Sequence, residues 1–183
     1  MTVRSPYIYR FENGMRYLFT VLVSFVFLTV CGQRTIAGVL DRYNSGAVDY
    51  ITVAELTQIT PILLDAREQE EFEVSHLEGA IWSGHKTFSI DSIQNRIPDK
   101  HSPIVVYCSI GVRSEDIAQK LVKAGYTDVS NLYGGIFQWK IDGNPVYDST
   151  GVQTEKVHAF SKYWGKLLTN AEKVYKTKPK DID

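Results

Sequence analysis

The apolar run Ile104–Tyr107 (IVVY) constrains the fold of this chain more than any other feature of the sequence. Its β-branched residues and its lack of charge are typical of a short strand buried in a parallel sheet. A short loop, residues 108–113 (CSIGVR), follows at once and leads into residues 113–124, where apolar residues recur at helical spacing. A buried strand that leads through a short loop into a helix is the repeating unit of an α/β fold.

Other segments repeat this alternation. We predict short strands at residues 62–64, 80–82 and 129–132, and helices at residues 53–58 and 68–73. Thr52 and Glu55 have capping-box spacing, Pro61 ends the helix that they begin, and Gly125 is placed to end the helix of residues 113–124. The predicted fold class is α/β, a parallel sheet of short strands flanked by helices on both faces, with its chemistry beyond the carboxyl ends of the strands.

Length and charge limit the possible functions. A chain of 183 residues can bury one core, so we expect one domain with appendages, and we expect it to be a monomer. A net charge of -1 supplies no basic field for nucleic acid, which favours a small-molecule or protein partner. The cysteines, Cys31 and Cys108, form neither a disulfide framework nor a C-x-x-C pair.

Residues 18–30 (LFTVLVSFVFLTV) are uncharged and follow Arg16. This run is shorter than the about 20 residues of a spanning helix and matches the apolar region of a signal peptide. Cys31 comes next, and LTVC resembles a bacterial lipobox, although Val30 stands where Gly or Ala is usual. We therefore expect a signal segment at residues 1–31, begun at Met1 or Met15, then a linker at residues 32–47. The protein would face the periplasm and be tethered to the membrane through lipid on Cys31; an ordinary secretion signal, an uncleaved anchor and a buried core helix remain alternatives.

Cys108 stands where a thiol would be activated. It follows a buried strand and precedes a helix, so it would meet the positive end of the helix dipole and unpaired backbone N–H groups. Gly111 lets the loop curl around an anion, and Arg113 adds a fixed positive charge. The plain alternative is a small buried hydrophobic residue.

Residues 48–146 resemble the rhodanese family. The matching motifs are LLDAREQEEFEVSHLEGAIW, the loop VVYCSIGVRS, and YGGIFQWKIDGNPV, in the family's order. The resemblance implies a domain at residues 48–147 in which the Cys108 thiolate takes sulfur from thiosulfate or a similar donor and passes it to cyanide or a thiol. It implies neither a cofactor nor a metal. The residues that would hold the sulfur are Ser109, Ile110, Gly111, Val112 and Arg113, with Asp65 and Arg67 at the base of the loop.

The other polar residues have structural interpretations. His76 matches the family's H-x-x-G-A pattern and would tie a turn together, and Asp65 would accept hydrogen bonds from amides of the Cys108 loop. His85, His101 and His158 are scattered without metal-ligand spacing, so we expect no metal site.

Residues 148–183 lie beyond the resemblance. Their apolar residues recur at helical spacing, which predicts a C-terminal helical extension packed on the domain, or else docked on a partner or a membrane surface. These residues are Val157, Phe160, Trp164, Leu167 and Leu168. Residues 177–183 would be disordered.

Other functions remain possible. A related fold uses a cysteine, a loop and an arginine as a tyrosine or dual-specificity phosphatase, but with five residues between the two, whereas four separate Cys108 from Arg113. The shorter loop between the cysteine and the arginine encloses a smaller space, which suits a sulfur atom better than a tetrahedral phosphate. A binding or sensor module without turnover is the other alternative.

Overall fold

The computed structural model describes residues 35–175. The chain divides between Thr35 and Ile36 into two units, and the described helices and strands all belong to the second. The expected signal segment, with Cys31, and the expected disorder of residues 177–183 lie outside the described residues. None of the helices in the described part is both long and apolar enough to cross a membrane.

A parallel sheet of five short strands forms the centre of the domain, in the order β1-β5-β4-β2-β3. The strands are β1 (Tyr50–Ile51), β2 (Ile62–Asp65), β3 (Ile81–Trp82), β4 (Ile104–Tyr107) and β5 (Val129–Leu132). Every pairing within it is parallel. The central strand β4 is buried along its whole length, as its apolar sequence predicts.

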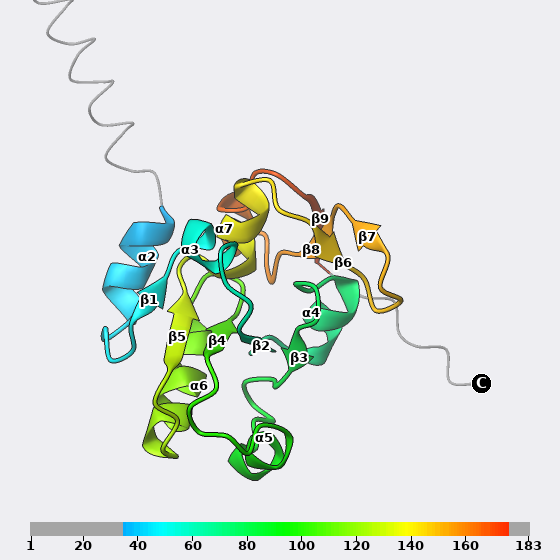
Figure 1. Ribbon diagram of the computed structural model, residues 1–183. Helices are drawn as coiled ribbons and strands as arrows, with labels where there is room; N and C mark the ends of the chain where they lie inside the picture. The colour runs from blue at the N-terminus through cyan, green and yellow to red at the C-terminus, as the bar shows by residue number, and fades with distance from the viewer. Residues whose placement is uncertain (1–34, 176–183) are drawn as a thin grey trace, which may run out of the picture. The chain divides into compact units, whose positions relative to one another are not determined.

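Helices cover both faces of the sheet (Figure 1). In the view of Figure 1, α3 (Val53–Leu56) and α7 (Gly135–Ile141) lie above the sheet, and α5 (Ile90–Arg96) and α6 (Val112–Lys123) lie below it. Val105 and Tyr107 of β4 belong to one apolar core, whereas Ile104 and Val106 belong to the other. The α/β class with helices on both faces is therefore confirmed.

The predicted linker at residues 32–47 is wrong for the part that the structure describes. Ile36–Tyr43 form the helix α2, which buries Ile36, Val39 and Leu40 in the first core. After the helix, the backbone N–H groups of Ser45 and Ala47 donate to Glu115 Oε1. The i, i+3, i+4 spacing of the buried residues is the helical signal, but it covers little more than two turns.

The predicted C-terminal helix is also wrong. The segment forms β7 (Gln153–Thr154), which pairs with β6 (Val146–Tyr147), and β8 (Lys156–His158), which pairs with β9 (Glu172–Val174). Between β8 and β9 lies a single 3₁₀ turn, η1 (Trp164–Lys166). Phe160 has a φ of 60°, which no α-helix accommodates, and Val157 and Ala159 are buried with the period of a strand. The apolar spacing therefore reflects residues that contact the domain from a strand and a turn.

Candidate active site

Cys108 is the first residue after β4 and lies at the base of a loop that ends in α6. The residue is 1% exposed. Gly111 caps α6 with a φ of 108°, a left-handed conformation that glycine adopts readily, and its N–H donates to Cys108 Sγ over 3.1 Å. The sulfur therefore lies at the positive end of a helix, with a loop amide directed at it.

The surroundings of the Cys108 thiol change its pKa in opposite directions. Burial raises the pKa, but the Arg113 charge and hydrogen bonds from Ser114 and Gly111 outweigh burial and lower it below its ordinary value. The Ser114 hydroxyl has a single proton, which it also directs at Asn131 Oδ1, 2.7 Å away. We therefore ascribe the lowered pKa mainly to Arg113 and to the backbone N–H groups of Ser114 and Gly111. The result is a thiol that favours its nucleophilic anionic form.

Two asparagine side chains form hydrogen bonds to the Cys108 loop. Asn131 Nδ2 and Asn44 Nδ2 donate to the Gly111 carbonyl oxygen over 2.8 Å and 2.9 Å. The first comes from β5 and the second from the residue after α2, so strand and helix together hold the Gly111 carbonyl group. The N–H of the same residue, in the preceding peptide unit, donates to the sulfur.

The Arg113 side chain is bound by a buried carboxylate. Its Nη1 and Nη2 donate to Glu71 Oε2 and Oε1 over 2.7 Å and 2.9 Å, and Nη2 also donates to Ser109 Oγ. The Ser109 hydroxyl itself donates to Glu71 Oε1 over 3.1 Å. Glu71 lies in α4 (Gln69–Val74) and is 2% exposed. The positive charge that the sequence predicts at the loop is present, but it is paired.

Asp65 and Arg67 lie where β2 ends, beside the end of β4. Asp65 pairs in register with Tyr107, and its carboxylate accepts hydrogen bonds from Arg67 N, Nε and Nη2. Arg67 Nη2 also donates to the carbonyl oxygen of Ser75, and both side chains are fully buried. The expectation that Asp65 accepts from amides of the Cys108 loop is therefore wrong, because Arg67 occupies its oxygens. The pair ties β2 to the end of α4 instead.

A cavity of about 260 Å³ opens above the loop. Its floor is formed by loop residues, and its walls are largely aromatic. The lining residues are Cys108, Ser109, Ile110, Val112 and Arg113 from the loop and α6, and Tyr43, Phe160 and Trp164 from elsewhere. The rings of Tyr43 and Trp164 meet edge to face at 6.4 Å, and the Arg113 guanidinium lies 5.0 Å from the centre of the Phe160 ring.

Most of the histidines contact groups that are not part of the Cys108 site. The backbone of His76 pairs with Tyr147, and its ring stacks on Phe72, so it holds a turn. His85 and His101 contact Asp116 and Thr127. His158 is the exception, since its Nδ1 lies 3.9 Å from Glu71 Oε1 and accepts from the Phe160 N–H.

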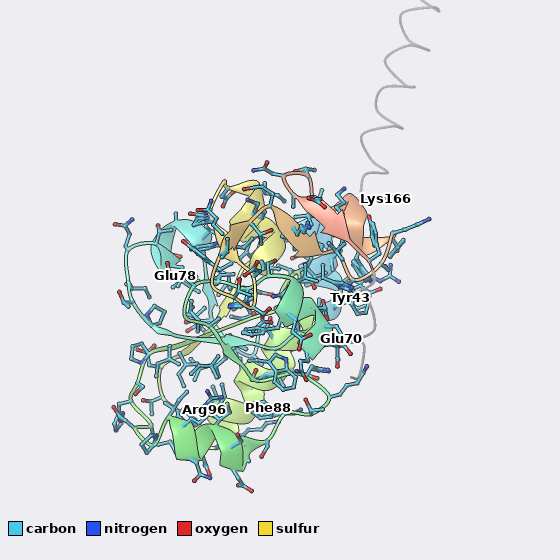
Figure 2. All side chains as sticks on the ribbon, turned by 90° about the vertical axis from the view of Figure 1, so that its right-hand side faces the viewer. Tyr43, Glu70, Glu78, Phe88, Arg96 and Lys166 are labelled. Atoms are coloured by element: carbon cyan, nitrogen blue, oxygen red, sulfur yellow. The ribbon has the colours of Figure 1, made fainter. Side chains whose placement is uncertain are left out.

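Sequence reasoning missed Glu71 and the aromatic residues of the cavity. Glu71 is one of several acidic residues in α4, and no local pattern distinguishes it from exposed Glu70, labelled in Figure 2. Tyr43, Phe160 and Trp164 lie far from Cys108 in the chain, so their meeting depends on tertiary structure. The spacing of Phe160 and Trp164 draws attention to them, but as parts of a helix.

Comparison with known proteins assigns the chain to a family. The model of the rhodanese-like domain matches residues 52–142. The thiosulfate sulfurtransferase GlpE of Coxiella burnetii is 33% identical over 79 residues, which are 43% of this chain and 71% of GlpE. The adenylyltransferase and sulfurtransferase UBA4 of Candida albicans is 34% identical over 121 residues, 62% of this chain. The alignment spans only 27% of UBA4.

Solved structures agree on the fold. Thiosulfate sulfurtransferase from Pseudomonas aeruginosa superposes with a TM-score of 0.51 at 23% identity, covering 66% of this chain and 23% of that one. The BH2092 protein from Bacillus halodurans gives a TM-score of 0.51 at 22% identity, covering 63% of this chain and 88% of that one. These structures show the same fold. The family match and the relationship to GlpE lead to one assignment: the chain belongs to the rhodanese-like domain family.

Proposed function

We propose that the protein is a sulfurtransferase in which Cys108 carries sulfur as a persulfide between a donor such as thiosulfate and an acceptor, cyanide or a thiol. The observation that carries this proposal is the buried Cys108 sulfur, at 3.1 Å from the Gly111 N–H and with a lowered pKa. The names of the relatives GlpE and UBA4, both sulfurtransferases, support the same class.

In the first step, the Cys108 thiolate attacks the outer sulfur of thiosulfate. The bond between the two donor sulfurs breaks, and sulfite leaves with its electron pair. The Gly111 amide, already directed at the cysteine sulfur, would hold the anion of the persulfide, and the α6 N-terminus would stabilise it further. In the second step, cyanide or a thiolate attacks the outer persulfide sulfur, and the Cys108 thiolate leaves.

The acceptor has to reach Cys108 from outside the domain. Within residues 35–175, Cys108 is the one cysteine, so no neighbouring thiol in that part of the chain can resolve the persulfide. The cavity above the loop provides the route to the sulfur.

Mass spectrometry of the full chain after incubation with thiosulfate tests the proposal. We expect the peptide that contains Cys108 to gain the mass of one sulfur atom and to lose it again when cyanide is added. Cys108→Ser should gain none, because an alcohol has no accessible anion at neutral pH. A wild-type peptide that stays unmodified with every sulfane donor would instead favour a binding or sensor module.

We propose separately that the protein is exported and tethered to the outer side of the cell membrane through Cys31. The support is the sequence alone: the uncharged run of residues 18–30 ends directly at this cysteine. The N-terminal mass of membrane-extracted protein tests it. A mature chain that starts at lipidated Cys31 is expected, whereas a chain that retains residues 18–30 would refute lipidation.

A further inference from the structure

The walls of the cavity above Cys108 come from segments outside the family match. Residues 52–142 supply the loop, but Tyr43 comes from the end of α2, and Phe160 and Trp164 come from the segment between β8 and β9. Val157, Ala159, Leu167 and Leu168 anchor that segment in the first core. The aromatic walls are therefore a fixed part of this fold.

The cavity presents little net positive charge. Among the described residues that line the cavity, only Arg113 has a permanently charged side chain. Both terminal nitrogens of its guanidinium donate to the carboxylate of Glu71. The Phe160 ring covers the guanidinium, at 5.0 Å. His158, behind Phe160, adds no charge at neutral pH, because burial lowers its pKa and its Nδ1 accepts the Phe160 N–H.

The backbone of Phe160 has an unfavourable conformation that places its ring at the cavity. A φ of 60° is unfavourable for a residue with a large side chain and makes Phe160 the one non-glycine residue with a positive φ in the described chain. The Ser161 N–H donates to the Ala159 carbonyl oxygen over 2.6 Å, which closes a tight turn around Phe160. Phe160 is 48% exposed, so its own burial does not account for the strain. The turn instead holds the ring at the cavity.

An inorganic dianion gains little in such a cavity. Thiosulfate would lose water and meet aromatic carbon and a cation that is already paired. An apolar organic group of similar reach would instead be removed from water against Tyr43, Phe160 and Trp164.

We propose that the aromatic walls select an organic sulfane-sulfur donor, a persulfide or thiosulfonate with a single negative charge and an apolar group, in preference to inorganic thiosulfate. This inference rests on the proposed sulfurtransferase function and specifies its substrate class. The apolar group lies against Phe160 and Trp164, and the terminal sulfur points to Cys108.

The transfer step has the same form for both donors. The Cys108 thiolate attacks the terminal sulfur, and the bond from that sulfur to the rest of the donor breaks. The organic group leaves with the electron pair as a thiolate or a sulfinate. The step needs no proton, oxidant or reductant. The donor anion and the Cys108 thiolate are converted into the Cys108 persulfide anion and the leaving anion, so the total charge is unchanged.

A comparison of donors with the full-length wild-type protein tests the selection. The probes are 4-methylbenzenethiosulfonate, methanethiosulfonate and thiosulfate, with cyanide as the acceptor. We expect kcat/KM to be highest for the aryl donor and on the order of 10-fold lower for the methyl donor, which has the same reacting atoms but little apolar surface. Thiosulfate should be the poorest donor.

Variants separate the effect of the aromatic walls from the intrinsic reactivity of the donors, because that reactivity cancels when the ratio of kcat/KM values is compared between a variant and the wild type. Phe160→Ala and Trp164→Ala should each lower the aryl-to-methyl ratio of kcat/KM by about fivefold. Phe88→Ala is the matched control, since Phe88 lies beside α5, at the far end of the domain from Lys166 of η1 (Figure 2). Its ratio should equal that of the wild type, and an unchanged ratio in folded Phe160→Ala and Trp164→Ala would overturn the inference.

A measurement on the wild type avoids dependence on the folding of variants. The product 4-methylbenzenesulfinate should protect Cys108 from iodoacetamide at about 10-fold lower concentration than methanesulfinate. Equal protection by the two sulfinates would also overturn the inference. If all three donors load sulfur on Cys108 without preference, only the substrate class fails; if none loads it, the sulfurtransferase proposal itself fails.

Discussion

The carboxylate of Glu71 binds both terminal nitrogens of the Arg113 guanidinium, at 2.7 Å and 2.9 Å. This ion pair joins α4 to the first turn of α6 and fixes the residue whose charge lowers the pKa of Cys108. Glu71 also accepts from the Ser109 hydroxyl and from the Glu68 N–H. Substitution of Glu71 should therefore change both the stability of the fold and the pKa of the Cys108 thiol.

Glu71→Gln should change how stability depends on acid. Burial raises the Glu71 pKa, but Arg113 and Arg67 outweigh it and lower that pKa below the unfolded value. The ionised carboxylate therefore stabilises the fold above the unfolded pKa, near 4.5, and this contribution is lost as pH falls through the lower folded pKa. At pH 7, we expect Glu71→Gln to cost about 3 kcal/mol, because Arg113 loses its charged partner.

Urea unfolding between pH 3 and pH 7 measures this effect. The free energy of unfolding of Glu71→Gln should vary less with pH than that of the wild type. Glu70→Gln, in the same helix but exposed, is the control and should follow the wild type. A Glu71→Gln curve parallel to that of the wild type would contradict the assignment.

Arg113→Ala should raise the pKa of the Cys108 thiol. Burial already disfavours the thiolate, and Arg113 is the largest of the influences that oppose burial. The pH at which iodoacetamide alkylation reaches half its maximal rate should therefore shift upward, and alkylation at pH 7 should slow. Arg96→Ala, in the last turn of α5, should leave the profile unchanged. Identical profiles for Arg113→Ala and the wild type would mean that the Gly111 amide and the helix dipole suffice.

Gly135→Ala should disrupt the Cys108 loop. A Cβ at Gly135 would overlap the Cys108 carbonyl oxygen and lie 2.9 Å from the Ser109 carbonyl carbon, and its φ is 53°. Gly143 also has a positive φ, 84°, but open space around it, so Gly143→Ala reports backbone strain alone. We expect Gly143→Ala to cost about 1 kcal/mol and Gly135→Ala roughly 3 kcal/mol or more in the free energy of unfolding. Equal losses would show that the close packing of Gly135 on the loop does not matter.

Aryl phosphates should not be hydrolysed by the wild type. Four residues separate Cys108 from Arg113, and Arg113 is bound by Glu71. A phosphate ester would therefore meet a loop too short to enclose it and an arginine that is already paired. An assay with 4-nitrophenyl phosphate measures this, and hydrolysis that disappears in Cys108→Ser would favour the phosphatase instead.

The sequence predicts the sheet and the Cys108 loop because their signals are local. The apolar run of β4 gives a buried strand, the capping box of Thr52 and Glu55 forms as expected, and Gly111 has the positive φ that a curled loop requires. Each of these features depends on a few neighbouring residues. The fold class follows from their order along the chain.

The aromatic walls and the partner of Arg113 could not be predicted in the same way. Glu71 lies 42 residues before Arg113, and nothing in the local sequence distinguishes its carboxylate from those of its neighbours until folding brings it to the Arg113 side chain. The segment around Phe160 has apolar spacing that fits a helix, but pairing between β8 and β9 overrides that preference. Contacts between distant segments decided both outcomes.

The origin of the cavity walls has an evolutionary consequence. The thiol and its activating groups lie in the part of the chain that matches the family model, whereas Tyr43, Phe160 and Trp164 lie before and after it. Mutations in those flanking segments can change the shape and polarity of the cavity without altering the residues that activate Cys108. Family members with the same loop but different flanking segments can thus diverge in substrate while they retain one chemistry.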